Sequence, residues 1–316
     1  AFGVDLMLAE APDLDLLCQK LRKSGTHAFL ATTLSTPLPM FEAALMRLGT
    51  WVQGKWAEGP KNSEAFVAGI HLEGPFLAES CCGAHPPQNL LDPTLQKLEH
   101  WWELSRHTLA RITLAPERGS PQEIEKILKF CSKHHISVAL GHSQATTEQA
   151  RHWRQRGIRQ LTHAWNAMPF HHRNPGILGE YLGAKGTWIE IIPDGVHVSD
   201  AVLGWTHLIH GQGPSHGVFW VSDCVPAGQT DGPCTFGPLS IRADEAAGGK
   251  VCRTPEGHLA GGGFTLSQHG TDALKRKAFK TLSRRAVLGL ISDAPWRALG
   301  LTPQRRKWKA RLAKAN

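Results

Sequence analysis

The chain of 316 residues has the composition of an ordinary globular protein, with 41% hydrophobic and 20% charged residues. It contains no apolar run of about 18 residues and no cleavable secretion signal, so we expect neither a membrane partner nor export. The formal net charge of +8 reflects basic residues crowded near the C-terminus, not a stripe interleaved with aromatic residues, so no nucleic-acid partner is expected.

Short apolar runs alternate with segments of helical periodicity through most of the chain. The predicted strands cover residues 27–34, 66–70, 111–115, 136–140, 158–162, 188–192 and 218–222. The predicted helices between them include residues 41–52, 121–134 and 147–156, and Gly157 is a favoured left-handed cap for the last of these. Buried apolar strands separated by helices indicate a parallel sheet, and therefore a protein of the α/β class.

The pattern changes after the last of these strands. Residues 228–263 are rich in Gly and Pro and predict a hairpin-bearing insertion that forms one wall of a pocket. A helix is expected over residues 278–299, interrupted by Pro295, and a solvated basic tail over residues 302–316. We therefore expect one barrel domain, residues 1–301, followed by the tail.

Four possible metal ligands or proton carriers follow directly after predicted strands: Glu73, His142, His163 and Asp223. The carboxyl ends of parallel strands meet at one mouth if the sheet closes into a barrel, and catalytic residues of that architecture gather there. Two imidazoles and one carboxylate leave a coordination position open for water, as catalytic zinc sites require. Asp223 would take the proton of that water and pass it to a leaving amine.

A structural interpretation of each residue is also open. The chain has 18 histidines, and a single histidine is more often an ordinary buried or exposed side chain than a metal ligand. Glu73 alone could cap a helix, and Asp223 alone could form a turn. The joint placement of the four residues at strand ends is what favours a metal-dependent hydrolase.

Nine sequence blocks carry a family resemblance. They are H-L-E-G-P-F (71–76), G-A-H (83–85), T-L-A-P-E (113–117), G-H-S-Q-A-T (141–146), T-H-A-W-N-A-M-P (162–169), R-N-P-G (173–176), D-G-V-H-V (194–198), S-D-C-V-P-A-G (222–228) and G-H-L-A-G (257–261). In order and spacing they resemble the N-acetylglucosamine-6-phosphate deacetylases of the amidohydrolase superfamily. The resemblance implies a (β/α)8 TIM-like barrel, usually with a small β-sandwich domain, and hydrolysis of the acetamido group to glucosamine 6-phosphate and acetate.

The resemblance also implies the catalytic residues. Glu73, His142 and His163 match the family's ligands for one divalent metal ion. Metal-bound hydroxide is then the expected nucleophile, Asp223 the general acid/base, and His85 a catalytic residue beside the acetyl carbonyl. Zn²⁺ is the first choice of metal, and Fe²⁺, Co²⁺ and Mn²⁺ suit the same ligands.

The substrate contacts follow from the same blocks. Asn166 and Ala167 match the substrate-contacting pair, His85 the histidine near the sugar, and Arg173 and His197 the contacts to phosphate and sugar. A guanidinium suits this role because its planar fork can bind a phosphate through two parallel hydrogen bonds. In the family the phosphate contacts are completed across a dimer interface, so the resemblance implies a homodimer acting on a phosphorylated N-acetyl amino sugar.

The chain departs from the family pattern in several places. It begins just after the strand that can bear a His-x-His pair in the family, and a small β-sandwich domain that is truncated or absent is expected. We expect one metal ion because Glu73, His142 and His163 suffice to bind one. Cys82 replaces a usual lysine, and Ser222 replaces a usual threonine. Two alternatives stay open: an amidohydrolase of another acylated amino sugar or cyclic amide, and an inactive truncated homologue that binds sugar phosphates.

Cysteine usage indicates the compartment. The seven cysteines show no C-x-x-C spacing, which argues against a disulfide framework and against a structural zinc site. A reducing cytoplasm is therefore the expected location.

Overall fold

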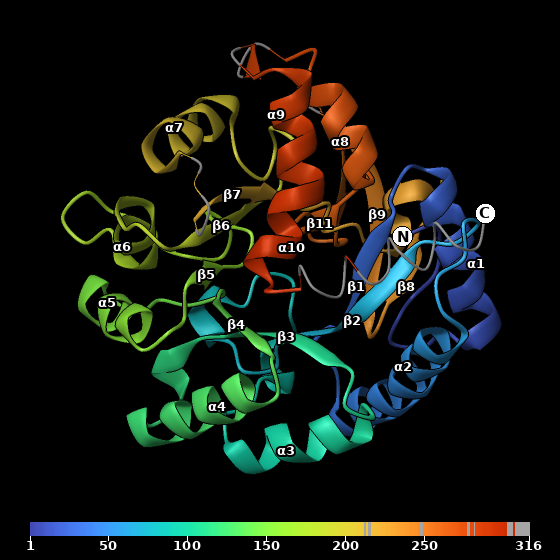
Figure 1. Cartoon of the computed structure of the whole chain (residues 1–316), viewed down its shortest axis with the longest axis horizontal. Helices are drawn as coiled ribbons and strands as arrows, with labels where there is room; N and C mark the ends of the chain where they lie inside the picture. Colours follow the sequence, from blue (N-terminus) through green and yellow to red (C-terminus); the bar gives the residue numbers. More distant parts are fainter. Residues whose placement is uncertain are drawn as a thin grey trace.

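A curled sheet of seven parallel strands forms the centre of the molecule (Figure 1). The computed structural model describes residues 1–211, 213, 216–246, 249–276, 279–280, 282–301 and 306. The strands follow one another across the sheet in chain order: β1 (Ala28–Thr32), β2 (Phe66–Glu73), β3 (Leu109–Leu114), β4 (Ser137–Leu140), β5 (Gln160–Leu161), β6 (Trp188–Ile191) and β7 (Gly217–Trp220). Each expected strand overlaps one of these seven.

Helices cover the outside of the sheet, as right-handed parallel crossovers require (Figure 1). They are α1 (Ala11–Lys23), α2 (Leu38–Glu58), α3 (Leu95–Leu104), α4 (Pro121–Lys133), α5 (Thr147–Gln155), α6 (Gly176–Gly183) and α7 (Asp200–His210). Helix α4 begins with the Ser120 side chain capping the backbone N–H of Glu123, and α5 begins with a capping box between Thr146 and Gln149. None of the helices in the described part of the chain has the length and apolar character needed to cross a membrane.

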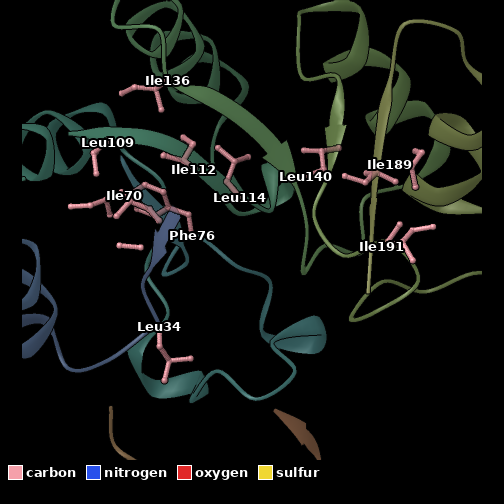
Figure 2. Packing of buried hydrophobic residues seen from close by; sticks show 14 of the residues in the cluster. Leu34, Ile70, Phe76, Leu109, Ile112, Leu114, Ile136, Leu140, Ile189 and Ile191 are labelled. Atoms are coloured by element: carbon pink, nitrogen blue, oxygen red, sulfur yellow. The ribbon is translucent and has the colours of Figure 1, made fainter. Parts of the chain in front are cut away.

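Aliphatic side chains of the strands build the core. Figure 2 shows residues of β2, β3, β4 and β6 packed together, among them Ile70, Leu114, Leu140 and Ile189, each essentially inaccessible to solvent. Burying such a side chain contributes about 1.5–3 kcal/mol relative to leaving it exposed. This core fixes the sheet, and the sheet in turn fixes the loops at its carboxyl edge.

The expectation of a closed barrel with eight strands is confirmed only in part. Within the described residues, β1 pairs with β2 and β7 pairs with β6, and no strand joins the two edges, so the sheet is a half-barrel of seven strands. Two short helices, α9 (Arg284–Leu288) and α10 (Ala294–Ala298), joined by a π-helical turn (Gly289–Asp293), lie beside the gap (Figure 1). Trp296 of α10 stacks on Phe66, the first residue of β2, at 6.5 Å between ring centroids, so this segment packs against the amino end of that strand.

The helix expected over residues 278–299 begins later, at Arg284, and its first residue lies outside the described part of the chain. The α-helix is interrupted by the π-helical turn Gly289–Asp293, and Pro295, which lacks a backbone N–H, lies in the first turn of α10 directly after it. The basic tail over residues 302–316 lies outside the described residues except for Arg306.

A second sheet follows β7. Four antiparallel strands, β8 (Cys234–Phe236), β9 (Leu239–Ala246), β10 (Gly249–Arg253) and β11 (Leu259–Gly262), occupy the region where a hairpin-bearing insertion is expected. After β11 the chain enters α8 (Leu266–Ala273). The last strand of this small sheet returns to the carboxyl edge of the main sheet, where Cys224 and Gly262 form an isolated β-bridge.

Candidate metal and catalytic site

Three side chains from different strands converge on one point. Glu73 ends β2, His142 follows β4, and His163 follows β5. The Oε1 atom of Glu73 lies 2.7 Å from Nε2 of His163 and 3.2 Å from Nε2 of His142, and the two imidazole nitrogens are 3.0 Å apart. All three residues are less than 10% exposed. Donor atoms this close together can share one cation bound at about 2.0–2.2 Å.

The chemistry of the three donors fits a divalent ion. Two imidazole nitrogens that face each other at 3.0 Å need a proton or a cation between them, because their lone pairs otherwise repel. Nδ1 of His142 lies 2.9 Å from the carbonyl oxygen of Cys81, and donation to this oxygen leaves Nε2 as a lone-pair ligand. Nδ1 of His163 has no hydrogen-bond partner among the described residues.

Electrostatics keeps this cluster charged. Burial raises the pKa of Glu73, but the hydrogen bonds from His142 and His163 outweigh it and hold that pKa well below its usual value. Burial lowers the pKa of His163, yet the Glu73 carboxylate raises it to about 9. A metal ion would replace the shared proton that these shifts describe.

His85 borders the same cluster and can be assigned a different role. Glu73, His142 and His85 have possible ligand atoms within 4.8 Å of one another, so His85 is a further candidate ligand. However, the backbone N–H of Ser35 donates to Nδ1 of His85 at 3.2 Å, and burial lowers the pKa of His85 to about 3. A neutral imidazole that accepts at Nδ1 carries its proton on Nε2, so His85 presents a hydrogen-bond donor instead of a ligand atom.

Asp223 lies three residues beyond Trp220, the last residue of β7. It lines the same cavity, of about 870 Å³, as Glu73, His142 and His163. Burial and the nearby Glu73 carboxylate raise the pKa of Asp223 to about 7, although His163 opposes the shift. A carboxyl group with this pKa can both accept and release a proton near neutral pH.

The cavity also brings together most of the expected substrate residues. His85, Asn166, Ala167 and His197 all line it. His197 is held by Asp194, whose carboxylate accepts from Nδ1 of His197 at 2.5 Å, so that Nε2 is left for a ligand. Arg173 is the exception, because it is exposed on the loop before α6 and does not line this cavity.

A buried ion pair beneath the site escaped the sequence analysis. Arg111 of β3 pairs with Glu190 of β6, and both side chains are at most 6% exposed. Arg111 also donates to Thr162 at 3.1 Å, while Oε1 of Glu190 accepts the backbone N–H of His163 at 3.1 Å. The pair therefore holds the backbone of His163, one of the three candidate metal ligands.

We expect Arg111→Met to lower the free energy of unfolding by about 3–5 kcal/mol, because it leaves the buried Glu190 carboxylate without a counter-charge. Chemical denaturation would measure the loss. The double variant Arg111→Met with Glu190→Gln should recover part of it, since the uncompensated charge is then removed. Equal stability of the single variant and the wild type would contradict the role given to this pair.

A half-barrel whose strands end in two histidines, a glutamate and an aspartate places the chain among the amidohydrolases of the TIM-barrel type. A search of protein-family models finds no match to the chain. The chain is 34% identical over 304 residues to an N-acetylgalactosamine-6-phosphate deacetylase of Escherichia coli O157:H7, covering 95% of this chain and 74% of that protein. It is 30% identical over 302 residues to the N-acetylglucosamine-6-phosphate deacetylase of Bacillus subtilis, covering 95% and 72%. The chain belongs to this family of N-acetylhexosamine-6-phosphate deacetylases, which are hydrolases, and this confirms the expected resemblance.

The chain aligns with only part of the length of its relatives. The N-acetylglucosamine-6-phosphate deacetylase of Lysinibacillus sphaericus is 32% identical over 248 residues, which cover 78% of this chain but only 60% of that protein. The solved structure of the Thermotoga maritima N-acetylglucosamine-6-phosphate deacetylase has a TM-score of 0.79 at 27% identity, covering 95% of this chain and 76% of that one. The chain thus spans between 60% and 74% of the length of these three curated relatives.

Proposed function

We propose that the chain hydrolyses the acetamido group of N-acetylglucosamine 6-phosphate to glucosamine 6-phosphate and acetate. The observation that carries the proposal is the convergence of Glu73, His142 and His163 beside Asp223 in one cavity. A mutant of the Mycobacterium smegmatis N-acetylglucosamine-6-phosphate deacetylase, with an aspartate changed to alanine, has been solved in complex with this substrate; it has a TM-score of 0.75 at 28% identity and covers 90% of this chain.

In this proposal Glu73, His142 and His163 hold one divalent ion, with zinc as first choice. When bound, such an ion acidifies water and polarises a carbonyl group. Asp223 takes the proton of the attacking water as the new C–O bond forms and delivers it to the amine nitrogen as the C–N bond breaks. Nε2–H of His85 donates to the oxygen of the acetyl group, where negative charge develops.

The remaining residues position the sugar. We assign Nε2 of His197, together with Asn166 and Ala167, to the sugar and its phosphate, since all three line the cavity. These contacts act chiefly by orientation, which places the acetyl carbon over the catalytic groups.

We further propose a homodimer in which Arg173 reaches the cavity of the second copy. Arg173 lies outside the cavity of its own chain. Large apolar side chains are exposed on the loop before α6, with Phe170 at 51%, and on α7, with Trp205 at 59% and Leu208 at 83%. Large apolar side chains left exposed in this number are compatible with a protein interface. A chain that sediments as a monomer at all concentrations would contradict the dimer.

We expect Arg173→Ala to raise KM for phosphorylated substrates by about 10- to 100-fold, which is what one or two lost charge-assisted hydrogen bonds are worth. KM for unphosphorylated sugars should not change. Steady-state acetate release measures both values, and Arg242→Ala, which removes an exposed arginine of β9, is the matched control. An equal effect on both substrate classes would favour an enzyme for unphosphorylated acyl amino sugars.

A panel of substrates tests the proposed reaction. N-acetylgalactosamine 6-phosphate must be included, because the relative in E. coli O157:H7 bears that name and is 34% identical. Acetate release should be fastest with an N-acetylhexosamine 6-phosphate. Turnover of a cyclic amide alone would favour the rival amidohydrolase, and binding without any turnover would favour an inactive homologue.

The cytoplasmic location is likewise a proposal. All seven cysteines are described and all are free thiols. Free thiols in such number fit a reducing compartment.

A further inference from the structure

The main chain alone places the proposed acid/base. Asp223 has a backbone φ of +46°, in the left-handed region that non-glycine residues rarely adopt. Its carboxylate has no hydrogen-bond partner within the described part of the chain, whereas its backbone carbonyl does. The position of the carboxylate therefore depends on how the peptides on either side of Asp223 are held.

Strand β11 of the small sheet holds those peptides. The backbone N–H of Gly262 donates to the carbonyl of Asp223 at 2.7 Å, and the carbonyl of Gly262 accepts from Val225 at 3.3 Å. Strand β11 is in turn paired with β10, where Gly262 lies opposite Val251. The backbone hydrogen bonds of Gly262 thus tie the small sheet to the segment that carries Asp223 at the carboxyl edge of the large sheet.

The contact is closer than any side chain allows. A Cβ atom at Gly262 would lie 2.0 Å from the carbonyl oxygen of Ser222 and 3.5 Å from that of Asp223. The first separation is far below van der Waals contact with a backbone atom, so the Ser222 peptide would have to move. That peptide directly precedes the catalytic aspartate.

We infer that Gly262 is a positioning residue for Asp223, and that the small sheet serves the reaction by fixing this aspartate. The inference rests on the proposed function only for its kinetic consequence. Its structural content is that residue 262 must lack a side chain for the Ser222 and Asp223 peptides to keep the position that places Asp223 in the cavity lined by Glu73, His142 and His163.

Steady-state kinetics of the Gly262→Ala variant test this role of Gly262. Because displacing a catalytic group by about 1 Å can cost about 100-fold in rate, we expect kcat to fall about 100-fold while KM and bound metal stay unchanged. A wild-type kcat in a folded Gly262→Ala protein would overturn the inference.

Gly263→Ala is the matched control. A Cβ atom there would lie 2.3 Å from the carbonyl oxygen of Lys250, so it disturbs β10 as severely but away from Asp223. The control should lose stability with little loss of kcat. An equal loss of kcat in both variants would mean that any damage to the small sheet has this effect, and would overturn the specific role of Gly262.

If Gly262→Ala does not fold, Ser222→Gly loosens the same peptide without added bulk and should also lower kcat; an unchanged kcat would count against the inference. A crystal structure of folded Gly262→Ala protein would show the position of Asp223 even if the wild type releases no acetate. Absence of acetate release by the wild type refutes the proposed function, whereas an undisplaced Asp223 in Gly262→Ala refutes the positioning role.

Discussion

Replacing Asp223 by asparagine should remove nearly all amide hydrolysis and leave the bound metal in place. Asparagine has the same shape but cannot accept the proton of the attacking water or give it to the amine. General acid–base catalysis contributes about 100- to 10,000-fold, so kcat should fall by at least about 100-fold. Acetate release and elemental analysis of the same sample measure the two outcomes.

The structure supports this expectation in two ways. Burial raises the pKa of Asp223 to about 7, so the carboxyl group can exchange a proton under ordinary conditions. Glu73, His142 and His163 bond to one another and not to Asp223, so its replacement should leave them in place. Asp231→Asn, which changes an exposed aspartate in the bend before β8, serves as control. Activity that survives Asp223→Asn would show that another group carries the proton.

Removing one imidazole donor should remove both the metal and the activity. We expect His163→Ala and His142→Ala to weaken metal binding by more than about 100-fold, because loss of an outer-sphere partner alone typically costs 10- to 100-fold. Calorimetric titration of the metal-free protein with Zn²⁺ measures the affinity. The same experiment on His100→Ala, which removes an exposed histidine of α3, should give the wild-type value.

The effect of these variants separates ligation from packing. Both histidines are buried, so their truncation also leaves small cavities that lower stability. A folded His163→Ala protein that retains one tightly bound metal ion would show that His163 is not a ligand. In that case the grouping of Glu73, His85 and His142 becomes the better description of the site.

Much of the site could be predicted from the chain because parallel strands end at a common edge. The apolar runs before Glu73, His142 and His163 predict buried strands, and a polar residue directly after each one must lie at that edge. The same rule applies to Asp223 after β7. Local sequence therefore carries the information for these positions.

Other features depend on contacts between distant segments and leave no local signal. The arginine in β3 is visible as a charge within an apolar strand, but nothing near it identifies Glu190 as its partner. The tautomer of His85 is set by Ser35, which lies on a different segment. Closure of the sheet is likewise a property of all its strands together: in the described part of the chain no strand joins β1 to β7, so the expected eight-stranded barrel is confirmed only in part.

Anomalous diffraction from crystals of the zinc-loaded protein is the most direct test of the metal centre. We predict a single strong peak in the cavity, at about 2.0–2.2 Å from Glu73, His142 and His163, with Asp223 facing the open coordination position. A peak bound by other residues, or a zinc-soaked crystal with no peak beside Glu73, would contradict the account.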